Sequence, residues 1–158
     1  VEVVAKTVAV MVALRLRLSV QKDKFPPEAT EKYFKLSLAY GFQPGFQPSL
    51  FTSGIHYRDR ELFKKYVPLC RLVSEAGWRP VNRLAVTATK DARVEQFGER
   101  NLTVFNHGKE PISAEVILLS SKDASAKDLV SRRELTSKGG VFTVPLAPGD
   151  VALLDFTR

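Results

Sequence analysis

The chain has 158 residues, 44% of them hydrophobic and 26% charged, a composition typical of a folded protein rather than a disordered one. Its formal net charge of +7 raises the question of a polyanionic partner. The basic residues are scattered and most have an acidic neighbour, so we expect no nucleic-acid surface. The single cysteine, Cys70, excludes an intrachain disulfide and a cysteine-rich zinc site.

Residues 1–20 are strongly apolar, yet their longest uncharged run, residues 7–14, is too short to span a bilayer. The segment has an early acidic residue, Glu2, and it lacks the basic start and small-residue cleavage site of a secretory signal. We therefore expect buried structure here, either helix or strand, and no membrane association. The compartment stays open, with the cytoplasm slightly favoured.

The next segment predicts a helix that begins at Pro26-Pro27-Glu28 and runs to about Leu38. Proline suits the first turn of a helix because its missing N–H is not needed there. Apolar residues recur every three or four positions, which predicts that one face of the helix packs inward; they are Ala29, Tyr33, Leu36 and Tyr40.

A second helix is expected from Arg60 to about Ala76, with Asp59 as its N-cap and Gly77 as its terminator. Pro68 lies inside it and is expected to remove a hydrogen bond and kink the helix. The predicted apolar stripe consists of Leu62, Phe63, Tyr66, Leu69, Cys70 and Val73. The run 78–80 is expected to close the helical part of the chain.

From residue 82 onward the spacing of apolar residues changes to every second position, which predicts a separate antiparallel β-sandwich over residues 82–158 behind a helical segment over residues 1–81. The fold class is thus α+β. Residues 120–127 are interpreted as a polar excursion between two halves of the sheet. Six short strands are expected, at Leu84–Ala88, Val94–Phe97, Leu102–Phe105, Ile112–Leu119, Val141–Val144 and Val151–Phe156.

The segment between the two helices, residues 39–48, combines two prolines and two glycines with aromatic residues and predicts an irregular loop. Aromatic faces and glutamine amides can contact a ligand, so this loop is the best candidate for a binding site. The alternative is that its aromatic side chains fill the core beneath the loop. The candidate ligand-binding residues are Tyr40, Phe42, Gln43, Phe46 and, just before the second helix, His56.

Residues that could carry catalysis are sparse. The chain has only two histidines, His56 and His107, which leaves little material for a triad or a multi-histidine metal site. His107 is expected in a surface turn and Cys70 in the core of its helix. No glycine-rich phosphate loop is present, and Asn101 begins a glycosylation sequon that lies in a predicted strand. We expect no catalytic residue, no metal and no cofactor in this chain.

Several motifs follow one another in a definite order, and they are the runs 40–46, 57–69, 75–81, 94–98, 102–106 and 144–154. Their order resembles the last βα unit of barrel-type glycoside hydrolases followed by their C-terminal β-sandwich. The likeness covers roughly residues 26–158, and its motifs are structural rather than catalytic. The resemblance implies the fold of the end of such an enzyme, and no acidic residue sits at a matching position that would carry a catalytic role.

A complete barrel needs about 250 residues, whereas only residues 1–81 precede the predicted sandwich. The resemblance therefore implies a truncated or diverged relative, or a fragment. The leading hypothesis is a non-catalytic accessory module that supports a barrel, partnered by the rest of a barrel or by self-association through residues 1–75. The alternative is a module that binds carbohydrate or protein without catalysis. Polyanion binding is a third hypothesis, which predicts salt-sensitive retention on heparin.

Overall fold

The computed structural model describes residues 26–45, 55–120 and 122–156. Expectations for residues 1–20 lie outside the described residues. Three helices are present in the described part: α2 (Pro27–Ala39), α4 (Ile55–Arg58) and α5 (Arg60–Ala76). They are followed by nine strands: β1 (Trp78–Arg79), β2 (Ala85–Val86), β3 (Ala92–Phe97), β4 (Asn101–Asn106), β5 (Ile112–Leu118), β6 (Ser125–Asp128), β7 (Arg133–Thr136), β8 (Val141–Leu146) and β9 (Val151–Asp155).

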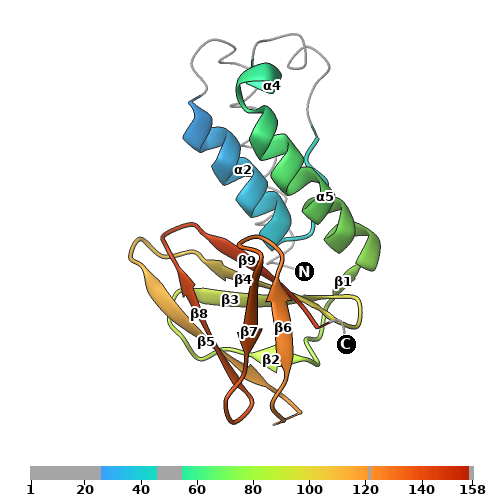
Figure 1. Cartoon of the computed structure of the whole chain (residues 1–158), viewed down its shortest axis with the longest axis vertical. Coiled ribbons are helices and arrows are strands. Elements are labelled where there is room, and N and C mark those ends of the chain that lie inside the picture. Colours follow the sequence, from blue (N-terminus) through green and yellow to red (C-terminus); the bar gives the residue numbers. More distant parts are fainter. Residues whose placement is uncertain (1–25, 46–54, 121, 157–158) are drawn as a thin grey trace.

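The strands form two antiparallel sheets, and the helix pair α2 and α5 rises from them as a third layer (Figure 1). The larger sheet has six strands in the order β1-β3-β4-β9-β6-β7, and the smaller has three in the order β2-β5-β8. The expected α+β class, a helical segment packed on an antiparallel β-sandwich, is confirmed. Strand β1 lies before the predicted division at Asn82 and nevertheless pairs with β3.

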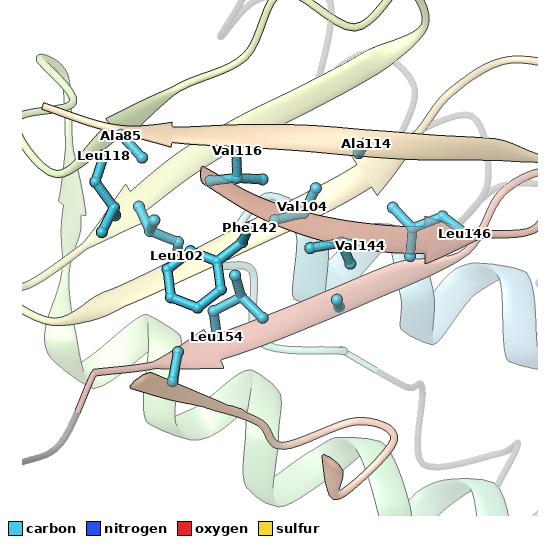
Figure 2. Close-up of a cluster of buried hydrophobic side chains, with 12 residues drawn as sticks. Ala85, Leu102, Val104, Ala114, Val116, Leu118, Phe142, Val144, Leu146 and Leu154 are labelled. Carbon is cyan, nitrogen blue, oxygen red and sulfur yellow. The ribbon is translucent and has the colours of Figure 1, made fainter. Parts of the chain in front are cut away.

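The core between the sheets follows from strict alternation along the strands. In β5, Ala114, Val116 and Leu118 are buried while the residues between them are exposed. These side chains meet Leu102 and Leu154 from the larger sheet, and Figure 2 shows the aliphatic groups gathered around Phe142. This is the period-two pattern that predicted the sandwich.

A second core lies on the opposite face of the six-stranded sheet, where the helices pack. All six residues of β4 are buried, because Leu102 and Val104 point into the sandwich while Phe105 packs against the helices. Strand β9 does the same, with Leu153 on the helix side and Leu154 on the sandwich side. The central strands therefore belong to two cores at once, and the helices are fixed to the sheet by apolar packing.

Helix α2 buries a different surface from the single face predicted for it: of that face only Tyr33 is buried, while Ala29, Leu36 and Tyr40 are half-buried. Phe34 and Leu38 are fully buried although they fall outside the predicted stripe. The reason is position: α2 contacts both α5 and the strands β4 and β9, so two of its faces are covered. Phe34 stacks on Tyr66 of α5 with 5.8 Å between ring centroids, and this contact ties the helices together.

Helix α5 has the predicted bounds and the predicted apolar stripe. Tyr66, Cys70 and Val73 are fully buried. Pro68 lies inside the helix but on its exposed side, where water can reach the carbonyl that loses its partner. Gly77 ends the helix with φ of 80° and donates its N–H to Val73, as expected of a terminating glycine.

Asp59 occupies the N-cap position of α5, but the prediction that its side chain caps the helix is wrong. Its carboxylate instead accepts hydrogen bonds from Thr30 of α2, at 2.6 Å, and from Arg58. The Arg58 guanidinium is the main cause of a lowered pKa for Asp59; burial opposes the shift, and the Thr30 hydroxyl reinforces it. The carboxylate therefore joins the two helices rather than capping one of them.

The interpretation of residues 120–127 as a polar excursion is also wrong, because β6 begins within this range. Strands β6 and β7 form a hairpin at the edge of the larger sheet, and β6 pairs with β9. Each places one apolar residue toward the core, Ala126 and Leu135. Short strands of an antiparallel sheet need only this much apolar content when one face is in solvent, so the period-two pattern was too weak to detect.

Candidate functional site

A groove of about 760 Å³ runs along the junction between α2 and the sandwich. One wall is a face of the helix, and the other consists of the β4–β5 and β8–β9 loops. Residues of α2 that line it recur at three and four positions, which places them on one side of the helix. The lining residues are Glu28, Glu31, Lys32, Lys35, Leu36 and Tyr40 from the helix side, with Phe105, Asn106, His107, Gly108, Lys109, Pro148 and Gly149 from the sandwich.

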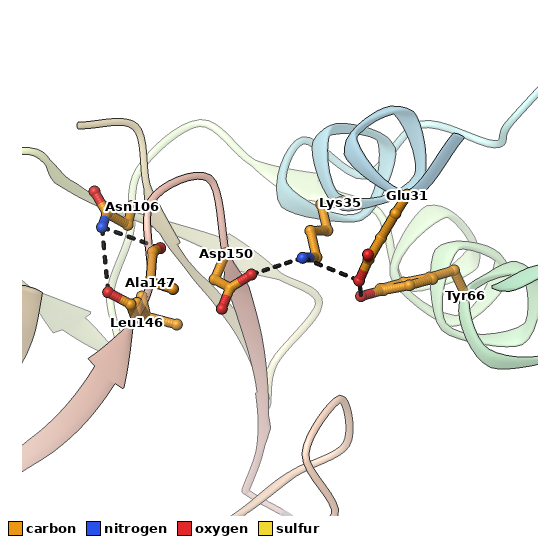
Figure 3. A network of polar contacts seen from close by, with 7 residues as sticks. All are labelled: Glu31, Lys35, Tyr66, Asn106, Leu146, Ala147 and Asp150. Atoms are coloured by element: carbon orange, nitrogen blue, oxygen red, sulfur yellow. Dashed lines mark hydrogen bonds and ion pairs between the residues drawn. The ribbon is translucent and has the colours of Figure 1, made fainter. Parts of the chain in front are cut away.

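An ionic network connects two lining residues of the groove, Lys35 and Glu31, to Asp150 and Tyr66 (Figure 3). Lys35 Nζ lies 2.7 Å from Asp150 Oδ1 and 3.0 Å from Glu31 Oε1. The Tyr66 hydroxyl donates to the same Glu31 oxygen at 3.3 Å. Burial alone would lower the pKa of Lys35, but the hydrogen bonds to Asp150 and Glu31 outweigh it and raise the pKa. Burial, followed by the charge of Glu31, raises the pKa of Tyr66, which keeps the phenol protonated.

Asn106, at the end of β4, holds the two sandwich loops in place. Its side chain is fully buried, and Nδ2 donates to the backbone carbonyls of Glu110 at 2.8 Å, Leu146 at 3.2 Å and Ala147 at 3.1 Å. Its Oδ1 accepts the Gly108 N–H at 2.9 Å. Both loops are thus bonded to one amide, which makes this wall of the groove pre-organised.

Tyr40 supplies an aromatic surface at the end of α2. It is half-buried and meets Phe105 edge to face, with ring centroids 6.1 Å apart at 62°. His107 and Lys109 are exposed on the opposite wall. Between them Gly108 approaches Asp91 so closely that an added Cβ would lie 2.8 Å from the Asp91 Cβ. The glycine therefore lets the loop lie flat against its neighbour.

The groove carries charges of both signs. Three lysines and two glutamates line it, so the formal charge of the lining is 3 − 2 = +1 with His107 neutral. Lys35 is already paired with Glu31 and Asp150. Such a surface offers hydrogen-bond donors and acceptors together, beside the apolar surfaces of Leu36 and Tyr40.

The predicted ligand-binding residues do not all line this groove. Tyr40 does, whereas Gln43 is exposed and lines a separate hollow of about 360 Å³ beside α5. Phe42 is half-buried, and its N–H donates to Ser37 at 2.8 Å. Phe46 and the His56 side chain lie outside the described residues, although the His56 backbone belongs to α4. The role of these residues in binding stays a prediction.

Sequence reasoning missed most of the groove. His107 and Lys109 lie far from Tyr40 in the chain, and they reach the same groove only because α2 packs beside the β4–β5 loop. The sequence predicts the turn after Asn106, but it does not predict that this turn lies beside α2. The sequence gives one signal in retrospect, the alignment of Lys32 with Leu36 and Tyr40 along one helix face.

Within residues 26–45, 55–120 and 122–156, no group of three or more histidine, cysteine, aspartate and glutamate residues could hold a metal ion. In the same part of the chain, no helix is both long enough and apolar enough to cross a bilayer. Cys70 is fully buried, and burial raises the pKa of its thiol to about 12. This thiol is a packing group and not an activated nucleophile.

No protein-family model matches this chain, and none of the curated proteins matches it. Solved structures do. AmyP in complex with maltotriose is 12% identical with a TM-score of 0.55, and the match covers 82% of this chain but 35% of that one. Alpha-galactosidase I from Mortierella vinacea is 13% identical with a TM-score of 0.50, covering 89% of this chain and 38% of that chain. An Anoxybacillus alpha-amylase is 15% identical with a TM-score of 0.51, covering 90% and 35%.

The chain thus spans 35–38% of the length of these three structures. At these identities the likeness concerns the fold alone. The resemblance expected from the sequence is confirmed at that level: the helix pair on its β-sandwich has the fold of part of amylase and α-galactosidase structures.

Proposed function

We propose that this chain is a supporting, non-catalytic module of a carbohydrate-active, glycoside hydrolase-like protein. Its sandwich holds α2 and α5 in a fixed position, so that further chain, either the rest of a barrel or a second copy, can pack against them. The observation that carries the proposal is the double burial of the central strands. Leu153 packs on the helices and Leu154 in the sandwich, so the helices cannot shift without disturbing both cores.

A further partner would pack on the outer side of the helix pair. Val67 is 39% exposed on α5, and Pro68 beside it is exposed as well. Two such residues are ordinary on a protein surface, so the presence of a partner has to be tested by experiment. Sedimentation of the purified chain tests the self-association arm of the proposal: a dimer is expected if a second copy supplies the cover, and a monomer at all concentrations would exclude that arm.

The proposed supporting role predicts that the helices and the sandwich unfold as one unit. Far-UV circular dichroism reports on the helices and Trp78 fluorescence on the sheet, since Trp78 lies in β1. The two urea transitions should coincide. Leu153→Ala on the helix side and Leu154→Ala on the sandwich side should each shift both transitions together, by about 2–5 kcal/mol. Separate transitions would show that the sandwich does not hold the helices.

The non-catalytic part of the proposal has its own test. The purified chain is incubated with chromogenic α-glucoside and α-galactoside substrates, and product is followed over time. We expect no release above that in buffer. Turnover that scales with protein concentration and disappears on heating would overturn this part, whatever the unfolding experiment shows.

A second candidate function is the binding of carbohydrate without catalysis. One observation favours it: the Tyr40 ring lines a groove of about 760 Å³, a volume within the roughly 300–1,000 Å³ of small-molecule sites. AmyP, one of the structures of similar fold, is a complex with maltotriose. Titration with oligosaccharides should then give a saturable signal, whereas a purely supporting module should give none.

A further inference from the structure

We propose that the groove between α2 and the β4–β5 and β8–β9 loops binds a short, uncharged oligosaccharide. The inference rests on the second candidate function and specifies its location, its ligand class and the residues that make contact.

The charge of the groove selects an uncharged ligand. A polyanion drawn to Lys32 and Lys109 would also face the carboxylates of Glu28 and Glu31. A cationic ligand drawn to Glu28 and Glu31 would also face the ammonium groups of Lys32 and Lys109. Hydroxyl groups both donate and accept, so a neutral polyol can bond to ammonium and carboxylate groups at the same time. The near balance of charge along this surface therefore favours a sugar over phosphate-rich or basic ligands.

The apolar part of the groove fits the same ligand class. Leu36 and Tyr40 line the groove on the helix side, and Pro148 lines it on the side of the β8–β9 loop. The Tyr40 ring is held by its edge-to-face contact with Phe105. A sugar ring has C–H groups that pack on such a surface while its hydroxyls reach the polar rim, which is the amphipathic use that tyrosine serves at binding sites.

The groove is also built before any ligand arrives. The Lys35–Asp150 ion pair fixes the helix wall to the β8–β9 loop, and Asn106 fixes that loop to the β4–β5 loop. Glu28, Lys32, His107 and Lys109 are exposed lining residues, so both carboxylate and cationic groups are available to a ligand. A pre-organised wall lowers the entropic cost of binding a flexible ligand.

The test is a titration of the isotope-labelled chain with maltotriose, followed by NMR. The backbone amides of Gly108, Lys109 and Gly149 should shift and saturate, because they belong to the groove wall. Lys109→Ala and Tyr40→Ala should each weaken binding about tenfold, the effect of losing one good contact. Lys127→Ala is the matched control, since Lys127 is an exposed lysine on β6, and its affinity should equal that of the unmodified chain.

Two further experiments, a salt series and a titration with a phosphate compound, test the class of ligand. Affinity for maltotriose should be the same at low and moderate salt, and inositol hexakisphosphate should not shift the groove amides. Binding of the phosphate compound with a steep salt dependence would overturn the proposal in favour of polyanion recognition. Saturable maltotriose shifts located elsewhere, or none at millimolar sugar, would also overturn it. Neither result would alter the shared unfolding transition, which tests the supporting role separately.

Discussion

Lys35 and Asp150 stand 115 positions apart in the chain, yet Lys35 Nζ lies 2.7 Å from Asp150 Oδ1. The pair joins α2 to the β8–β9 loop. Its partner on the helix, Glu31, also bonds the Tyr66 hydroxyl of α5. A single lysine therefore connects both helices and the sandwich through polar contacts, beside the apolar core that does the same through packing.

Replacing Lys35 by methionine should lower the free energy of unfolding by about 1–2 kcal/mol, measured by urea denaturation. The methionine keeps the apolar stem but leaves Glu31 and Asp150 without their cation. The Lys35 side chain is 20% exposed, so the pair is only partly screened by water and should contribute more than a surface ion pair.

Lys64 provides the matched control for this substitution. It pairs with Glu61 at 2.7 Å on the exposed surface of α5, with a side chain that is 57% exposed. Lys64→Met should change the free energy of unfolding by no more than about 0.5 kcal/mol. Equal effects of the two substitutions would mean that the Lys35 network does not stabilise the helix–sandwich junction.

Gly41, just after α2, is a site where a single methyl group should be costly. Its φ is +69°, and an added Cβ would lie 2.2 Å from Cε1 of Phe97, a fully buried ring. Gly41→Ala should destabilise the protein by about 2–5 kcal/mol, from left-handed backbone strain together with overpacking.

The same substitution at Gly139 separates backbone strain from overpacking. Its φ of +59° is similar, but an added Cβ would meet no atom within 4 Å. Gly139→Ala should cost only about 1–2 kcal/mol. Combining Gly41→Ala with Phe97→Leu should then give a non-additive recovery in a double-mutant cycle. If both alanine variants lose the same stability, the Phe97 ring is not the obstacle.

The elements that the sequence predicted well are those whose burial repeats locally. Strand β5 alternates buried and exposed residues, and α5 presents Tyr66, Cys70 and Val73 on one stripe, so period and element agree. Elements governed by distant neighbours were predicted less well. Phe34 is buried because α2 lies against α5 and the sheet together, and no spacing within α2 states that.

The candidate site was harder to predict for the same reason. Tyr40 was identified because aromatic residues in a loop stand out by composition. Lys109 and His107 lie on a loop whose contact with α2 is decided by how the helix docks on β4 and β9. The Asp59 carboxylate shows the limit at the scale of one residue: its position as an N-cap was predictable, but its bond to Thr30 depends on the second helix.

Asn106 should be the most sensitive polar residue of the sandwich. Asn106→Ala would leave the carbonyls of Leu146 and Ala147 and the N–H of Gly108 without this partner. The expected loss is about 2–4 kcal/mol, because several buried groups lose hydrogen bonds together. Thermal unfolding measures it, with the exposed Thr143→Ala of β8 as control. A loss below about 0.5 kcal/mol, typical of a surface site, would contradict the role assigned to this amide.

Cys70 should make the free energy of unfolding decrease at alkaline pH. The ordinary thiol pKa of 9.0 rises to about 12 in the folded protein, mainly by burial. The contribution is fully present below pH 9, where the unfolded chain also keeps its proton. Above pH 9 the unfolded state loses the proton first, so the free energy of unfolding should fall by about 1.4 kcal/mol per pH unit.

Cys70→Val should flatten this decline between about pH 9 and pH 10 while leaving neutral stability within about 1.5 kcal/mol, as a substitution of similar volume. Above pH 10 a decline should remain in the variant, because burial also raises the pKa of the Tyr66 phenol above its ordinary value of 10.0. Urea unfolding at a series of pH values, with thiol labelling in parallel, measures both effects. Rapid labelling of Cys70 in the folded protein at pH 8 would show that the thiol is accessible, and the buried contact between α5 and α2, where Cys70 Sγ lies 4.0 Å from the Phe34 carbonyl oxygen, would then have to open far more often than its packing implies.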